Sequence, residues 1–144
     1  MHYWDTSALA KLYVSEPDSP QFAAYLAATG PITTSELARW ELFRVLVRKE
    51  AEGLIPAGAA EAIFASFLTD VAAGKVALVP MTPRLETRFQ QLVVRLHRLT
   101  PRLMVRSLDG IHIATADLHG ADALVVSDAN MRKCAAAIGL ELYP

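Results

Sequence analysis

The chain contains 144 residues, of which 53% are hydrophobic, and it has a formal net charge of −1 and a mean hydropathy of +0.27. This apolar content excludes a disordered chain and predicts one domain, residues 1–144, with a core two or three layers deep. The average charge says little about a nucleic-acid partner, and no apolar run approaches the roughly eighteen residues that a membrane span requires.

The single cysteine, Cys134, sets the expected redox environment. One cysteine can form no internal disulfide and offers no cysteine-based metal site. The N-terminus has neither a basic region nor a long apolar run, so no signal peptide is expected. Together these features favour a protein of the reducing cytoplasm.

Short strand patterns alternate with helical patterns in the first half of the chain. Strands are expected at 2–5 and 31–35, and helices at 7–14, 20–29, 33–53 and 56–74. In the helix over 33–53, Thr33 and Glu36 fit a capping box. Its apolar residues recur at helical spacing and predict the buried stripe Leu37, Trp40, Phe43, Leu46 and Val47.

The second half of the chain continues the alternation. Strands are expected at 75–81, 121–128 and 140–144, and helices at 82–99, 107–120 and 129–139. Pro80 indicates that the first of these strands lies near an edge of the sheet or ends there, and Thr82 followed by Pro83 is typical of a helix start. The alternation predicts an α/β fold with a parallel sheet covered on both faces, and such sheets bind ligands beyond the carboxyl ends of their strands.

The charges are unevenly distributed along the chain. Between Arg84 and Arg106 there are six arginines and one acid, a local charge of +5, so the rest of the chain carries −6. Either this segment is a basic face that attracts a polyanion, or it is the solvated face of an amphipathic helix.

Four carboxylates lie in informative positions, and each also has a simpler explanation. Asp5 and Asp128 each follow a strand, and both could serve only as helix N-caps. Asp109 opens a helix and could serve only the helix dipole. Glu41 lies at the margin of the predicted apolar stripe, where a carboxylate needs a metal ion, another cation or a proton. The alternative for Glu41 is an ion pair with Arg44 or Lys49.

Considered as a set, the four acids predict a cation site at the carboxyl edge of the sheet. Clustered carboxylates repel one another unless a hard divalent ion such as Mg²⁺ lies between them. Such ions promote hydrolysis of phosphodiesters by water, and no Cys–His or Ser–His–Asp set is evident. His112 lies one turn after Asp109 and could touch the site, although a histidine in such a position is more often packed or solvated.

Three segments resemble the PIN domain family, and more narrowly the VapC-type toxins of bacterial toxin–antitoxin pairs. "YWDTSALAKLY" is similar to the opening motif of the family, and "TTSELARWEL" is similar to its second motif, with a serine six residues before Glu41. "RSLDGIHIATADLHGADALVVSDANMRKCAAAIGLELYP" resembles the C-terminal part throughout. The middle of the chain, residues 54–100, matches only in general helical character.

The resemblance implies a three-layer α/β/α fold and an acidic site that binds Mg²⁺ or Mn²⁺ and cleaves RNA with a metal-activated water. It implies that Asp5, Glu41 and Asp109 hold the metal and that Asp128 completes the set, directly or through water. Thr6 or Ser7 would position the first acid or a water. A homodimer and a small antitoxin that blocks the site are also implied. If the chain is such a ribonuclease, basic residues such as Arg84, Arg88, Arg95 and Arg98 are expected to help hold the RNA.

Two alternatives stay open at this point. A phosphatase of the haloacid-dehalogenase type also begins with an Asp at a strand end, but its second Asp would fall at Ser7. The third possibility is a binding module that keeps the fold without turnover.

Overall fold

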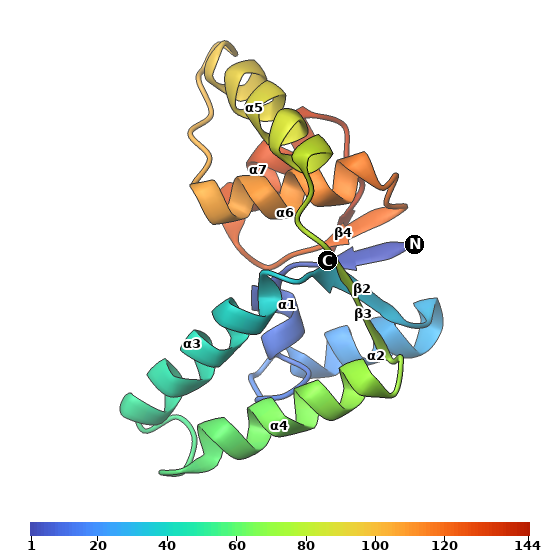
Figure 1. Ribbon diagram of the computed structural model, residues 1–144. Helices are drawn as coiled ribbons and strands as arrows, with labels where there is room; N and C mark the ends of the chain where they lie inside the picture. Colours follow the sequence, from blue (N-terminus) through green and yellow to red (C-terminus); the bar gives the residue numbers. More distant parts are fainter.

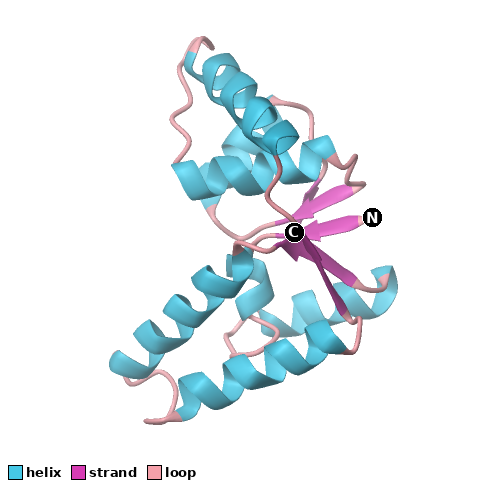
Figure 2. Cartoon of the chain, viewed as in Figure 1, coloured by secondary structure: helices cyan, strands magenta, loops and turns pink.

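The computed structural model describes residues 1–144 and has a five-stranded sheet at its centre (Figure 2). All strand pairs are parallel, and the spatial order is β3-β2-β1-β4-β5. The predicted parallel sheet is therefore confirmed, and the expected edge position of the third strand is correct. The strands are β1 (His2–Trp4), β2 (Ile32–Ser35), β3 (Val76–Val79), β4 (Ala123–Val125) and β5 (Leu142–Tyr143).

Seven helices cover the two faces of the sheet and complete the predicted three layers (Figure 1). The helices of the first layer are α1 (Thr6–Ala10), α2 (Ser19–Thr29), α3 (Ala38–Ala51) and α4 (Ala59–Ala72). Those of the second layer are α5 (Pro83–His97), α6 (Ser107–Leu118) and α7 (Ala129–Ala137). No helix is both long enough and apolar enough to cross a membrane.

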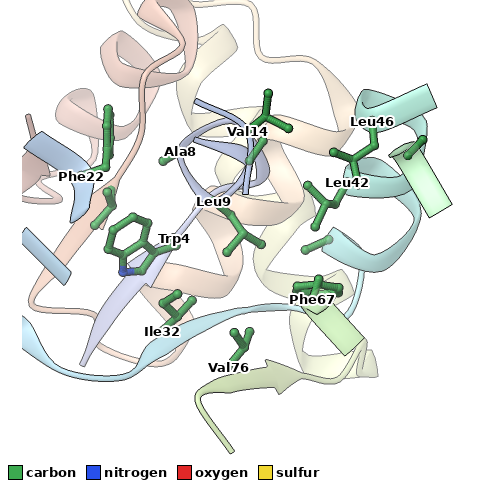
Figure 3. Close-up of a cluster of buried hydrophobic side chains, with 14 of the residues drawn as sticks. Trp4, Ala8, Leu9, Val14, Phe22, Ile32, Leu42, Leu46, Phe67 and Val76 are labelled. Atoms are coloured by element: carbon green, nitrogen blue, oxygen red, sulfur yellow. The ribbon is translucent and has the colours of Figure 1, made fainter. Parts of the chain in front are cut away.

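Each layer encloses its own hydrophobic core, because successive strand residues point to opposite faces of a sheet. Trp4 is fully buried in the core of the first layer, together with Phe22 and Phe67 (Figure 3). Tyr3, its neighbour in β1, is buried in the core of the second layer with Ile113 of α6. The short strand β1 therefore anchors both layers.

The start of α3 differs from the expectation. Thr33 lies in β2 and pairs with Ala77, so it cannot cap a helix, and the predicted capping box is wrong. The side chain of Glu36 instead accepts a hydrogen bond from the backbone N–H of Met81 at 3.0 Å. Sheet pairing of the threonines outweighs the local capping pattern, and α3 begins at Ala38.

The buried face of α3 also differs from the predicted apolar stripe. Trp40 is 64% exposed, and Phe43 and Val47 are exposed as well, whereas Leu42 and Leu46 are fully buried. The apolar residues of this helix surround most of its circumference, so periodicity alone does not identify the side that meets the sheet. Packing selects the face that carries Leu42 and Leu46 and leaves an apolar surface on the outside.

The chain order creates a crevice between β1 and β4. From β1 the chain enters the first layer through α1, whereas from β4 it enters the second layer through α7 (Figure 1). The two connections diverge at adjacent strand ends, which is the topological switch point where parallel sheets bind ligands. Asp5 and Asp128 follow these two strands.

Candidate active site

A pocket of about 370 Å³ lies at the carboxyl edge of the sheet, between the two helical layers. The four acids predicted from the sequence all line it, although they come from distant parts of the chain. Its other polar walls are three hydroxyl side chains, three arginines and one histidine. The residues concerned are Asp5, Glu41, Asp109, Asp128, Thr6, Ser7, Ser107, Arg44, Arg48, Arg106 and His112.

Asp5 forms the buried floor of the pocket and is 5% exposed. Its carboxylate accepts hydrogen bonds from the backbone N–H groups of Ser7 and Ala8, at 3.1 and 3.0 Å, and so caps α1. The Ser7 hydroxyl donates to the same carboxylate at 2.7 Å. Burial raises the pKa of Asp5 above its usual value despite these donors. The expected cap is therefore present, and the same carboxylate also faces the pocket.

Glu41 is held by two side chains from different helices. Thr6 of α1 donates to Oε2 of Glu41 at 2.6 Å, and Nε2 of His112 lies 2.6 Å from the same oxygen. Burial acts to raise the pKa of Glu41, but the hydrogen bonds from His112 and Thr6 outweigh it and hold the pKa below its usual value. Lys49, one of the partners considered for Glu41, pairs with Glu16 at 2.6 Å instead.

Asp109 and Asp128 share one partner, Arg106. Its guanidinium donates to Asp109 at 2.7 Å and to Asp128 at 2.9 Å. Asp128 also caps α7 by accepting from the backbone N–H of Met131 at 2.8 Å. This N–H and, after it, Arg106 hold the pKa of Asp128 below its usual value. Asp109 lies in the first turn of α6, as its simpler explanation required.

The donor chemistry of the pocket fits a hard divalent cation. Four carboxylates from four segments face one hollow, and Mg²⁺ and Mn²⁺ prefer oxygen ligands of this kind. As the side chains stand, no three Asp, Glu, His or Cys groups are close enough to ligate one ion. Hydrogen bonds hold the carboxylate of Glu41 toward Thr6 and His112, and Arg106 holds the carboxylates of Asp109 and Asp128. The role of the four acids as metal ligands stays a prediction.

Comparison with known proteins identifies the family. The sequence profile of the PIN domain matches residues 3–137, which is nearly the whole chain. The chain belongs to the PIN domain family. The family resemblance and the fold inferred from it are therefore confirmed.

Relatives of this PIN domain include named ribonucleases. Ribonuclease VapC46 of Mycobacterium tuberculosis is 33% identical over 140 residues, which cover 96% of this chain and 92% of the relative. The crystal structure of VapC20 from the same organism, a Sarcin-Ricin loop cleaving toxin, has a TM-score of 0.70 at 20% identity and full coverage of both chains. A toxin–antitoxin complex from Klebsiella pneumoniae has a TM-score of 0.58 at 19% identity, covering 89% of this chain and 87% of that one.

The positive side chains that line the pocket of this PIN domain are not the ones singled out in the sequence. Arg44 and Arg48 of α3 and Arg106 line it, whereas the four arginines proposed as RNA contacts lie outside. One of those four, Arg88, forms an ion pair with Asp117 of α6. The sequence contains a signal for Arg44 and Arg48. They follow Glu41 by three and seven residues, a helical spacing that puts all three side chains on one side of α3.

The roles of the two hydroxyl residues are divided. Ser7 holds Asp5, as expected for one of the pair, and its hydroxyl also lies 2.9 Å from that of Ser127 at the end of β4. Thr6 holds the second acid, Glu41, rather than the first. His112 is packed, as its simpler explanation has it, and it also touches the site, since Nε2 contacts Glu41 directly.

Proposed function

We propose that the chain, acting as a single domain of residues 1–144, is a divalent-metal-dependent endoribonuclease and the toxin of a VapBC-type pair. The observation that carries the proposal is that four carboxylates distant in the sequence line one pocket at the switch point of a PIN fold. The kinship with a protein named as a ribonuclease, at 33% identity over nearly the full chain, supports RNA as the substrate.

Asp5, Glu41, Asp109 and Asp128 would hold the cation, with Mg²⁺ or Mn²⁺ as the candidates. A bound divalent ion supplies Lewis-acid chemistry, polarising a phosphate oxygen and lowering the pKa of a water ligand. Asp5 suits the centre of this set, because burial without a cationic hydrogen-bond partner leaves its negative charge uncompensated.

Arg44 and Arg48 would bind the RNA backbone at the mouth of the pocket. Both are exposed, line the pocket and have no acid of the pocket as a hydrogen-bond partner. Arg84, Arg95 and Arg98, on or at the end of α5, would extend the positive surface away from the pocket. Phosphate contacts of this kind give affinity and salt dependence rather than base specificity.

Protein partners are supported by the outer face of the first layer. Trp40, Phe43 and Leu68 are exposed on α3 and α4, and large exposed apolar side chains that gather in one place are typical of protein interfaces. We assign this apolar face to protein contacts in general, and a cognate antitoxin and a second copy of the chain are the expected partners. The site of action would be the cytoplasm.

The phosphatase alternative is not favoured by the contacts of Asp5. A nucleophilic Asp needs a free oxygen and a neighbouring general acid, whereas Ser7, at the position of that acid, donates its hydroxyl to Asp5. Acyl-phosphate on Asp5 after incubation with a phosphate ester would revive this alternative.

The test is RNA cleavage by the purified protein with total bacterial RNA as substrate. We expect cleavage with Mg²⁺ or Mn²⁺, none with excess EDTA, and none for Asp5→Asn. Glu61→Gln is the matched control, because Glu61 is an exposed acid on α4 outside the pocket. Cleavage that persists in EDTA or in Asp5→Asn, or an inactive wild type, would overturn the proposal.

A further inference from the structure

One buried side chain of the pocket is neither an acid nor a basic group at its mouth. His112 is 2% exposed and lies on α6, one turn after Asp109. Both of its ring nitrogens have partners: Nε2 lies 2.6 Å from Oε2 of Glu41, and Nδ1 lies 2.8 Å from the hydroxyl of Tyr3. The imidazole therefore connects a predicted metal ligand to the core of the second layer.

The contact with Glu41 determines which ring nitrogen carries the hydrogen. The carboxylate of Glu41 can only accept, so Nε2 of His112, 2.6 Å from Oε2, must donate. Nδ1 then accepts the phenol hydrogen of Tyr3, whose oxygen accepts from the backbone N–H of Ser35 at 3.0 Å. The ring hydrogen then lies on Nε2 and is donated to Glu41. A chain of hydrogen bonds therefore runs from the backbone N–H of Ser35 through the Tyr3 hydroxyl and the His112 imidazole to the carboxylate of Glu41.

Both donors to Glu41 converge on one of its two oxygens. Thr6 and His112 both contact Oε2, and no hydrogen bond engages Oε1. A carboxylate anchored through one oxygen presents the other in a fixed direction. This is the arrangement that partners behind metal-binding carboxylates typically enforce.

We propose that His112 is a positioning residue for the cation site: it holds Oε2 of Glu41 as a hydrogen-bond donor through Nε2, with Tyr3 supporting the ring at Nδ1, so that Oε1 is presented to the metal. This inference rests on the proposed function, since it assumes that Glu41 is a metal ligand. It adds a residue, a tautomer and a direction of binding that the four acids alone do not give.

The same contacts join the two layers that form the walls of the pocket. Glu41 belongs to α3 in the first layer and His112 belongs to α6 in the second, on opposite sides of the sheet (Figure 1). Tyr3 and Ser35 belong to the two central strands β1 and β2. The donors therefore connect both layers and the sheet at the place where the acids must meet.

The test is metal affinity, measured without RNA by titrating the purified full chain with Mn²⁺ and following free Mn²⁺ by electron paramagnetic resonance. For His112→Ala we expect the affinity to fall about tenfold to a hundredfold, the range found for partners of metal ligands. For His112→Gln, whose amide can donate in place of Nε2, we expect most of the affinity to return. Tyr3→Phe should lose several-fold, because Nδ1 loses its hydrogen-bond donor and the imidazole is held less firmly against Glu41.

His119→Gln is the matched control, because His119 is exposed at the end of the same helix, and it should bind Mn²⁺ as the wild type does. Unchanged affinity in His112→Ala, or no return in a folded His112→Gln, would overturn the proposal. Loss of binding in Asp5→Asn but not in His112→Ala would reject the positioning role alone. Equal binding in the wild type and Asp5→Asn would reject the metal site itself.

A measurement on the wild type keeps the proposal testable if His112→Ala does not fold. Nitrogen-15 chemical shifts of histidine-labelled, metal-free protein distinguish the two tautomers, and His112→Gln identifies the signal. We expect the hydrogen of His112 on Nε2. A hydrogen on Nδ1 would overturn the proposal.

Discussion

The pocket has two halves that fix their carboxylates in different ways. In the inner half, Asp5 and Glu41 are held by Ser7, Thr6 and His112, which are short or rigid side chains on packed elements. In the outer half, one long side chain, Arg106, is shared by Asp109 and Asp128, and Asp128 is held in addition by the backbone N–H of Met131.

Exposure of the acids separates the halves only in part: Glu41 and Asp109 are alike, with side chains 18% and 17% exposed, whereas Asp5 is buried and the side chain of Asp128 is 34% exposed. The exposure of the partner side chains separates the halves more clearly, because His112 is 3% exposed and Arg106 is 65% exposed. A buried, packed partner fixes a carboxylate, whereas an exposed ion pair contributes little and can exchange with solvent. The inner half is therefore preorganised, and the outer half can rearrange around a cation or a phosphate.

The largest expected effect compares one acid from each half. Glu41→Gln should lower the rate of RNA cleavage by about a hundredfold, because loss of one preorganised electrostatic contact commonly costs two to three orders of magnitude. Asp128→Asn should cost about tenfold, since the outer half can readjust. Single-turnover cleavage measures both, and equal losses would show that the two halves do not differ in function.

The next effect concerns Arg106. Arg106→Ala should increase Mn²⁺ affinity about fivefold, because a positive charge close to two carboxylates opposes a cation through roughly 1 kcal/mol of exposed Coulomb interaction. Arg84→Ala, an exposed arginine on α5, is the control. Weaker Mn²⁺ binding in Arg106→Ala would mean that Arg106 orders the outer acids for the metal.

A third prediction concerns the arginines at the mouth of the pocket. Arg44→Ala and Arg48→Ala should each weaken RNA binding about threefold to tenfold at low salt. Each should also reduce the slope of log affinity against log salt concentration by about one, as expected for the loss of a single phosphate contact. Binding to an oligoribonucleotide at several salt concentrations gives the slope. If Arg95→Ala had the larger effect, the RNA path would follow α5 instead.

The smallest effect is on stability, and it has opposite signs in the two halves. The pKa of Asp5 is raised, so its charged form destabilises the metal-free fold above the folded pKa, and Asp5→Asn should not lower the melting temperature at pH 7. The pKa of Asp128 is lowered, so its charge stabilises the fold above the unfolded pKa, and this contribution is lost as the pH falls through the folded pKa.

Asp128→Asn should therefore cost about 0.3–1 kcal/mol at pH 7, as for a charge at a helix N-terminus. Both differences from the wild type should shrink toward acidic pH. Thermal melting in EDTA from pH 3 to 7 gives the signs. The same sign for both variants would contradict the contrast between the halves.

The sequence predicted the strands, their parallel arrangement and the acids at strand ends, because these follow from local patterns. It could not identify the packed face of α3, since Trp40 and Leu42 are equally apolar in the pattern and only the sheet distinguishes them. The contact between His112 and Glu41 joins residues 71 positions apart, and no local period marks it. The bridge from Arg106 to Asp128 likewise depends on where β4 ends.

The position of β4 in the sheet determines when the pocket can assemble. This strand borders β1, with His2 opposite Ala123, yet it is synthesised long after β1. A growing chain therefore contains Asp5 well before it contains Asp128. A chain that has not reached β4 lacks both a sheet neighbour of β1 and the fourth acid, so the pocket can assemble only after this segment is made.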